Sequence, residues 1–370
     1  MSQLTKSSIR RGSTRITLSR ILKWTCVYLM FCTGMFRFAE WMISRRGGLV
    51  VLTFHRILPD AALSSTSSLP GMVVSQSMFG AFLSYLSKRF EVIDLRDASA
   101  SGVFQNNKLR FAVTFDDGWL DNYEVAQPIV GHFRLPMAVF VCPRKMGTKS
   151  PFWPEKVSRL LHGLRTSGVP RPSNSSQSGG RFEEFGIEEA CRAAPEKVVD
   201  ILKMFPPKKL ADFIRELESL ANAKQSSAAD NRYPDQTMSW NQAAQLGERG
   251  VTIGSHTLNH SILTQLLPSD VRFEIVGSKR EIEAQLGQPC LLFAYPNGNC
   301  DPEIRNAVEQ AGYALAFTTR PGYWAKGDDP WLIPRINISE NSLAGPTAKF
   351  SKVAFQYSIL WKAFQARWKH

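Results

Sequence analysis

The stretch RFAVTFDDGW, residues 110–119, ends a run of strand character in two adjacent carboxylates and a glycine. Two like charges this close repel each other, and burying either one costs several kcal/mol unless a partner compensates it. A metal ion bound next to Asp116 and Asp117 would be such a partner. The alternative is a plain turn in which an aspartate caps the helix that follows the strand.

Six further apolar runs are predicted to be strands, and segments of helical periodicity lie between them. One helix is predicted over residues 270–286, before Gly287, and a weaker one over residues 121–132, which Pro128 interrupts. This alternation favours a parallel sheet, and about seven strands favour a barrel over an open sheet. The predicted strands are residues 49–54, 111–115, 137–141, 251–254, 291–295, 315–318 and 332–338.

The predicted barrel covers residues 47–340, and a segment without strand character, residues 151–237, interrupts it. Two helical patterns, at 155–164 and 208–222, lie in this segment beside two spacers rich in Ser, Gly, Pro and Ala. We therefore expect a helical insertion that acts as a lid or substrate-side cap, and not an independent domain.

The net charge of +13 is concentrated at the two ends of the chain. Residues 1–46 contain nine Lys or Arg and one acidic residue, and residues 341–370 contain five and none. Residues 47–340 consequently hold 31 residues of each sign. Basic tails suit nucleic acid or an anionic membrane. Because both tails are also rich in Trp, Phe and Leu, a membrane surface is the predicted partner, and the neutral middle argues against nucleic acid.

Each tail contains one candidate membrane segment. The uncharged N-terminal run, residues 24–36, is shorter than the ~20 residues that span a bilayer. It predicts an uncleaved anchor or interfacial helix, with cleaved export as the alternative. Residues 349–370 predict an amphipathic helix at an anionic surface, and the alternative is a helix packed on the core through the same face. We expect association with a bacterial-type cytoplasmic membrane, on a side that the sequence does not specify.

Two histidines supply the remaining candidate metal ligands. In SHTLNH, residues 255–260, His256 and His260 are four residues apart and would share one face of a helical turn. An aspartate and two histidines leave open positions for water and substrate, as a catalytic metal requires. The second aspartate would then take a proton from the attacking water.

These motifs resemble those of the NodB-type polysaccharide deacetylases, carbohydrate esterase family 4. TFDDG (114–118) is similar to the first motif, SHTLNH to the second, and FAYPNG (293–298) to the third. The arrangement is similar to that of the circularly permuted members. The resemblance implies a distorted (β/α) barrel that removes N-acetyl groups from sugars, with its site at the carboxyl ends of the strands.

The resemblance also implies a role for each matching residue. Asp116 corresponds to the general base, and Asp117 to the metal-binding aspartate beside His256 and His260. The backbone N–H of Asn297 corresponds to a donor that stabilises the oxyanion. The ion would be divalent, with Zn²⁺ as the default and other divalent ions compatible with the same ligands.

The sequence departs from the family pattern at three positions, and at one of them Asn297 stands where the family usually has a tyrosine after the proline. Ala294 stands where the third motif usually has an arginine, and no Leu-x-His motif supplies a general acid near the C-terminus. His55, at the end of the first predicted strand, is similar to the early histidine of permuted members and is the predicted acid; the alternative is a structural histidine. Arg335 is predicted to replace the missing arginine beside Asp116, and the alternative is an arginine that pairs with a structural carboxylate.

The sequence thus predicts a metal-dependent N-deacetylase that acts on an amino sugar in a polysaccharide or a lipid-linked precursor. One alternative keeps the site and removes another acyl group, such as formyl, from a lipid-linked amino sugar. The other is a non-catalytic, membrane-docked module that only binds glycan.

Overall fold

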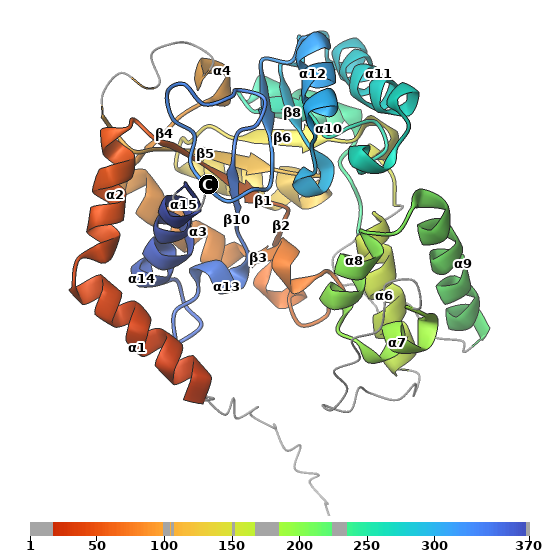
Figure 1. The fold of residues 1–370 in the computed structure, drawn as a ribbon, viewed down its shortest axis with the longest axis horizontal. Coiled ribbons are helices and arrows are strands. Elements are labelled where there is room, and N and C mark those ends of the chain that lie inside the picture. Colours follow the sequence, from red (N-terminus) through yellow and green to blue (C-terminus); the bar gives the residue numbers. More distant parts are fainter. Residues whose placement is uncertain are drawn as a thin grey trace, which may run out of the picture.

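The computed structural model describes residues 18–98, 104, 107–149, 152–166, 185–223 and 235–367. Seven parallel strands form a nearly closed barrel in the order β10-β1-β5-β6-β7-β8-β9 (Figure 1). A parallel bridge between Phe317 and Ile333 connects its two edges. The predicted distorted (β/α) barrel is therefore confirmed. Its strands are β1 (Leu49–Phe54), β5 (Arg110–Phe115), β6 (Ala138–Val141), β7 (Thr252–Ser255), β8 (Leu292–Ala294), β9 (Leu315–Phe317) and β10 (Arg335–Asn337).

The continuous apolar runs in the sequence reflect burial of the strands on both faces. All six residues of β1 and all six of β5 are buried, and the two strands pair along their whole length. Side chains that face the barrel interior pack around Phe140 and Phe317, whereas side chains on the other face pack against the surrounding helices. Because the strands are parallel, their carboxyl ends meet at one end of the barrel.

Three of the helices around the barrel begin at a side-chain cap. Ser75, Ser239 and Asp301 accept hydrogen bonds from the backbone of the first turns that follow them. The predicted helix at 121–132 is a π-helical turn, Asn122–Ala126, followed by α5, with the proline in the first turn of α5. The helices around the barrel are α3 (Gln76–Arg89), α4 (Leu95–Ala98), α5 (Gln127–His132), α10 (Trp240–Glu248), α11 (Pro268–Leu286) and α12 (Pro302–Gln310). Short strands β2 (Arg56–Leu58) and β3 (Val73–Ser75) pair with each other, and β4 (Glu91–Val92) pairs with β5.

The insertion forms a helical layer beside the mouth of the barrel (Figure 1). It has its own apolar cluster, centred on Val157, Leu161, Leu202 and Leu217. The sequence predicted two helices here, but the described part of the insertion contains four, because two short helices lie between the predicted ones. The spacers fall almost wholly outside the described residues. The helices are α6 (Trp153–Thr166), α7 (Ile187–Arg192), α8 (Pro195–Leu202) and α9 (Pro207–Ala223).

The C-terminal helix packs on the barrel through its apolar face. It runs from α14 (Lys352–Phe355) through a π-helical segment, Gln356–Trp361, to α15 (Lys362–Arg367), after the short helix α13 (Glu340–Leu343). Phe355, Ile359, Leu360 and Ala363 are all buried in the main core. The prediction that this face lies on a membrane is therefore wrong, and the alternative of a helix packed on the core is correct.

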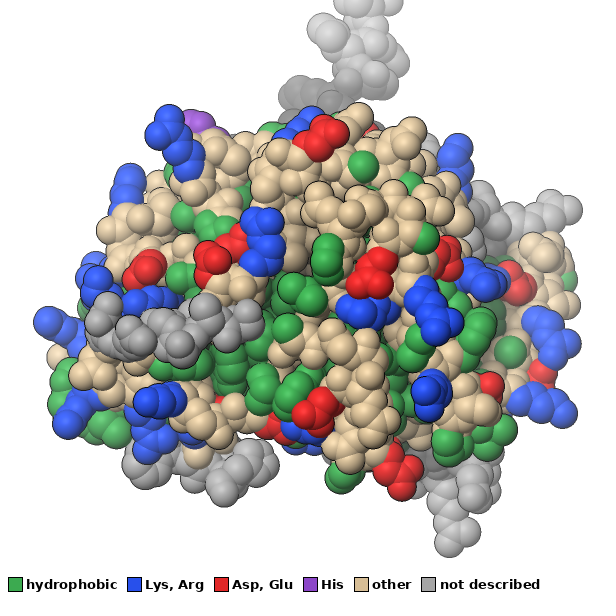
Figure 2. Space-filling model, turned by 90° about the horizontal axis from the view of Figure 1, so that it is seen from above, with side chains coloured by type: hydrophobic (Ala, Val, Ile, Leu, Met, Phe, Trp, Pro, Cys, Tyr) green, Lys and Arg blue, Asp and Glu red, His purple; other side chains and the backbone are tan. Residues whose placement is uncertain are grey.

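The N-terminal helices α1 (Leu18–Cys32) and α2 (Met35–Arg45) cover the C-terminal helix from outside (Figure 1). Gly34, with φ of 78°, separates them. Among the described residues, no single helix is long and apolar enough to cross a membrane, although Ile21–Cys32 and Met35–Arg45 together are, with a 59° bend between them. Figure 2 shows basic and acidic side chains interspersed over one face of the molecule, with hydrophobic side chains between them.

Candidate active site

The two adjacent aspartates lie at the carboxyl end of β5, on a turn that only a few residue types adopt. Asp117 has φ of 74° and Gly118 has φ of 68°, so both are in the left-handed region. A Cβ atom on Gly118 would lie 2.9 Å from Val141 Cγ1. The turn directs both carboxylates into the barrel mouth, where each is 2% exposed. The turn that the sequence offered as the alternative is therefore present, and it places the two carboxylates in the barrel mouth.

Asp117, His256 and His260 converge on one point. Asp117 Oδ1 is 3.7 Å from His256 Nε2 and 3.3 Å from His260 Nε2, and the three ligand atoms lie within 4.8 Å of one another. The histidines do not share a helical turn, as the spacing suggested. They lie on a loop after β7, where Thr257 and His260 both have φ of 64°.

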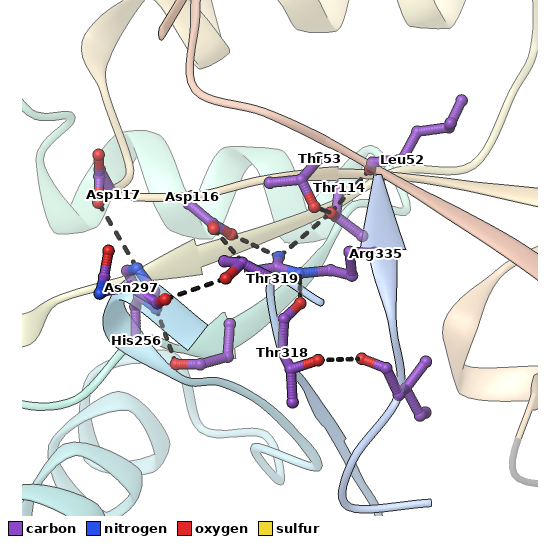
Figure 3. Close-up of polar contacts among 12 residues, drawn as sticks. Leu52, Thr53, Thr114, Asp116, Asp117, His256, Asn297, Thr318, Thr319 and Arg335 are labelled. Atoms are coloured by element: carbon purple, nitrogen blue, oxygen red, sulfur yellow. Dashed lines mark hydrogen bonds and ion pairs between the residues drawn. The ribbon is translucent and has the colours of Figure 1, made fainter. Parts of the chain in front are cut away.

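The donor set fits a divalent ion. His256 Nδ1 lies 2.8 Å from the carbonyl oxygen of Ala294, which fixes Nδ1 as the protonated nitrogen and leaves Nε2 as a lone-pair donor (Figure 3). Asp117 Oδ1 is buried without a hydrogen-bond partner, an arrangement that a cation between these atoms would compensate. An aspartate with two histidines is a set that suits Zn²⁺ and similar ions.

Burial and charge keep His256 and Asp117 in the protonation states that suit a bound metal. Burial lowers the pKa of His256 to about 4, so the imidazole is neutral at pH 7. Burial alone would raise the pKa of Asp117, but the adjacent His260 imidazole, with the charges of the other histidines, holds it below its ordinary value.

Two supports for the candidate metal ligands are not apparent from the sequence motifs. Trp119 Nε1 donates to Asp117 Oδ2 at 3.0 Å, and the Arg56 guanidinium lies 4.5 Å from the centre of the Trp119 ring. Arg56 is itself held by Asp121, at 3.0 Å, and by a short contact to Asp235 at the end of the insertion. This buried network ties the insertion to the carboxylate that would bind the metal.

The second support is Glu274 on α11, which holds the histidine loop. Its carboxylate accepts from the backbone N–H groups of Leu258 (2.8 Å) and Asn259 (2.9 Å) and from the Ser261 hydroxyl (3.0 Å). Glu274 lies among the buried residues of α11. A carboxylate on the buried face of a helical pattern is the sequence signal that could have identified it.

Asp116 forms a two-pronged ion pair with Arg335 from β10. Both Nη1–Oδ1 and Nη2–Oδ2 are 2.8 Å, and Arg335 Nε donates to the carbonyl of Thr318 at 3.1 Å (Figure 3). Burial alone would raise the pKa of Asp116, but Arg335, with His256 and His55, holds it below its ordinary value. Asp116 is therefore an ionised carboxylate at neutral pH, as a general base must be.

The other predicted catalytic residues border the same cavity, which has a volume of about 250 Å³. His55 follows β1, and its buried Nδ1 has no hydrogen-bond partner. Burial lowers the pKa of His55, against the charges of Asp117 and Asp116, which raise it. Asn297 has φ of 56°, and its carbonyl accepts from Thr319 Oγ1 at 2.9 Å. The structure thus brings every predicted site residue to one cavity, while the catalytic and metal-binding roles of these residues stay predictions.

Comparison with known proteins links this site to one family. A family model described as polysaccharide deacetylase matches residues 218–316. The protein YxkH of Bacillus subtilis (strain 168), named as a candidate polysaccharide deacetylase, is 29% identical over 98 residues. That alignment covers 26% of this chain and 35% of YxkH, so the chain matches about a third of its relative.

Solved structures extend the similarity to most of the chain. IcaB from Ammonifex degensii has a TM-score of 0.50 and 21% identity, and the match covers 80% of this chain and 93% of IcaB. BC0361, a polysaccharide deacetylase from Bacillus cereus, has a TM-score of 0.50 and 16% identity, over 84% of this chain and 67% of that one. At these identities the structures show a shared fold.

The family match and the candidate site overlap in part. Residues 218–316 contain His256, His260 and Asn297, whereas Asp116 and Asp117 precede the matched segment. The barrel joins the two parts, because β5 and β7 are separated by β6 alone.

Proposed function

Since the chain belongs to the polysaccharide deacetylase family, we propose that it is a metal-dependent hydrolase that removes N-acetyl groups from amino sugars of a polysaccharide or a lipid-linked glycan precursor. The observation that carries the proposal is that one cavity contains two carboxylates with different partners. Asp117 faces the imidazoles of His256 and His260, of which His256 is neutral at pH 7, and Asp116 is ionised against Arg335.

Each side chain has a distinct part in this reaction. A divalent ion held by Asp117, His256 and His260 would polarise the amide carbonyl and make a bound water more acidic. Asp116 accepts the proton that the attacking water gives up, and Arg335 keeps its two oxygens in a fixed orientation.

The remaining groups act on the amide itself. The backbone N–H of Asn297 donates to the oxygen that gains negative charge, a contribution worth about 3–4 kcal/mol in comparable sites. His55, which lines the same cavity, protonates the departing amine.

Acetate release from N-acetylglucosamine oligomers tests this function. We expect release that stops with a chelator and returns with Zn²⁺, that is abolished in Asp116→Asn, and that is much reduced in His55→Ala. His132→Ala, which changes an exposed histidine on α5, is the matched control and should keep full activity. Full activity in His55→Ala would remove that residue from the role of acid. A chain that binds one metal ion yet releases no acetate would contradict the proposed reaction with this substrate.

The acyl group is a separate part of the proposal, because formyl and acetyl place the same demands on the metal and base. Parallel assays with N-formyl and N-acetyl forms of one amino sugar distinguish them. A kcat/KM that is higher for the formyl substrate would replace deacetylation by deformylation at an unchanged site.

We also propose that helices α1 and α2 dock on an anionic membrane surface. The exposed apolar side chains of these helices form a patch, and the exposed Lys23, Arg37, Arg45 and Arg46 lie among them. The single acid of the patch region, Glu40, pairs with Arg89 at 3.0 Å. The patch comprises Ile21, Leu22, Tyr28, Leu29, Met35, Phe38 and Trp41.

Vesicle sedimentation with the full chain tests this docking. We expect binding to vesicles with phosphatidylglycerol, weaker binding in high salt, and loss of binding in Phe38→Ser. Phe273→Ser is the matched control, because Phe273 on α11 is 57% exposed and Phe38 is 52% exposed. Equal vesicle binding by both variants would contradict docking through α1 and α2, and a concentration-dependent dimer without vesicle binding would assign the patch to a second copy of the chain.

A further inference from the structure

The insertion contributes a buried carboxyl group to the cavity that the proposed reaction does not use. Glu155 lies in the first turn of α6, is 2% exposed, and lines the same cavity as Asp116, Asp117 and His55. Its Oε1 is buried and has no hydrogen-bond partner. A buried carboxyl oxygen without a partner is costly, which points to a ligand that satisfies it.

The start of α6 is fixed directly against the metal site. The Phe152 ring lies 4.9 Å from the His260 ring and 5.1 Å from the Trp119 ring, both measured between ring centres. One turn later, Ser158 Oγ donates to the carbonyl of Ser67 at 2.6 Å. The other face of α6 packs into the insertion's own apolar cluster. Glu155 is thus held at the cavity wall by packing on both sides of it.

Among the residues that the structure describes, Glu155 forms no ion pair, and it lies outside the candidate metal site. In the described part of the chain, the ligand atoms of Asp117, His256 and His260 lie within 4.8 Å of one another, and Glu155 does not belong to this group. Arg56 is engaged by Asp121 and Asp235.

A neutral hydroxyl matches what this carboxyl offers. Burial raises the pKa of Glu155 to about 8, and the charge of Asp117 adds to the effect. At pH 7 the group is then mainly protonated, and it both donates and accepts a hydrogen bond, as a sugar hydroxyl does. Trp153, Pro154 and Val199 from the insertion line the same cavity with apolar surface, and Lys203, a further cation there, pairs with Asp200 at 3.1 Å. Such a wall suits the apolar face of a pyranose ring.

We propose that the insertion is a substrate-binding wall in which Glu155 hydrogen-bonds a ring hydroxyl of the amino sugar whose amide lies at the metal site. This inference rests on the proposed function for the identity of the sugar. Glu155 acts in binding and leaves proton transfer to Asp116 and His55.

Two measurements on Glu155 variants test the proposal. In steady-state acetate release, Glu155→Leu should raise KM on the order of tenfold or more with little change in kcat, whereas Glu155→Gln, which still donates and accepts, should raise it less. Thermal unfolding should show an unchanged or higher Tm in Glu155→Leu, because an unsatisfied buried carboxyl has been removed. Glu218→Leu, on α9 and paired with Lys156 outside the cavity, is the matched control for KM.

The second measurement separates this inference from the proposed reaction. Calorimetric binding of the same oligomer to Asp116→Asn, with and without Glu155→Leu, needs no turnover, and weaker binding in the double variant supports the inference even if the wild type releases no acetate. Unchanged KM and unchanged binding in Glu155→Leu would overturn it. So would a fall in kcat alone, which would make Glu155 an acid or base, or a loss of bound metal, which would make it a ligand.

Discussion

Replacing Arg335 with glutamine would test whether the guanidinium holds Asp116 as a buried, ionised base. The pair has two 2.8 Å contacts, and its side chains are 1% and 3% exposed. Removing one partner of such a pair costs about 3–5 kcal/mol, because the other charge stays buried without compensation. We therefore expect a fall in Tm on the order of 5–15 °C at pH 8. Loss of an oriented base adds a fall in kcat of about 10²-fold or more.

The dependence on pH follows from the sign of the pKa shift. In the wild type the folded pKa of Asp116 lies below its unfolded value of about 3.9, so the pair stabilises the fold above that pH and the benefit is lost as pH falls through the folded pKa. Without Arg335, burial raises the folded pKa above the unfolded one. The variant's loss of stability should then be greatest at pH 8 and smaller at pH 5, and the acidic limb of kcat against pH should move to higher pH.

Unfolding curves and pH–rate profiles of three variants decide the matter. Arg335→Lys keeps the charge without the two-pronged geometry and should be intermediate. Arg305→Gln removes a partly exposed pair with Asp329 and should cost less than about 1 kcal/mol, with unchanged kinetics. An acidic limb and a kcat in Arg335→Gln equal to those of the wild type would refute the reasoning, as would additive effects of Arg335→Gln and Asp116→Asn in a double-mutant cycle.

Three further changes probe the metal ligands and the Asn297 turn. His256→Ala should lower bound metal, measured by elemental analysis, from one ion per chain to a small fraction, and chelation of the wild type should lower its Tm until Zn²⁺ is returned. Trp119→Phe removes the donor to the metal-binding carboxylate and should weaken metal affinity about 10- to 100-fold in a chelator competition, and unchanged affinity would exclude that role. Gly298→Ala would place a Cβ atom 2.1 Å from a side-chain oxygen at φ of 74°, whereas Gly312→Ala, at φ of 79°, meets nothing within 4 Å. The first should therefore lower both Tm and kcat, the second should cost only about 1 kcal/mol, and equal losses would contradict the steric argument.

The sequence predicted the barrel well because its strands are buried on both faces. Such strands appear as continuous apolar runs, and all seven predicted runs coincide with strands to within a few residues. The helical turn predicted for His256 and His260 is wrong, because two residues of the loop are left-handed and a spacing of four does not reveal that. Short α7 and α8 were missed because each has too few turns to show a period.

The supports of the site were harder to predict than its ligands. Arg56 and Asp235 are 179 residues apart in the sequence, and their pairing depends on how the insertion folds back onto the barrel. Trp119 stands in the opening motif, yet nothing in its local pattern shows that its indole N–H faces Asp117. The C-terminal helix has the same apolar face whether a membrane or a protein core covers it, so periodicity alone could not decide between them.

The arginine that pairs with Asp116 shows how residues from different strands can reach the same place in the barrel mouth. Asp116 follows β5, and Arg335 reaches it from β10 across β1, the strand between them. Ala294 stands where the family motif usually has an arginine. Its carbonyl oxygen accepts a hydrogen bond from His256 Nδ1, which determines that Nδ1 is the protonated nitrogen of that imidazole. Any residue at position 294 could supply this carbonyl oxygen, because it belongs to the backbone. The guanidinium that pairs with Asp116 comes instead from Arg335, on another strand of the barrel. The chemistry therefore constrains where the charge lies in the barrel mouth and not which strand carries it.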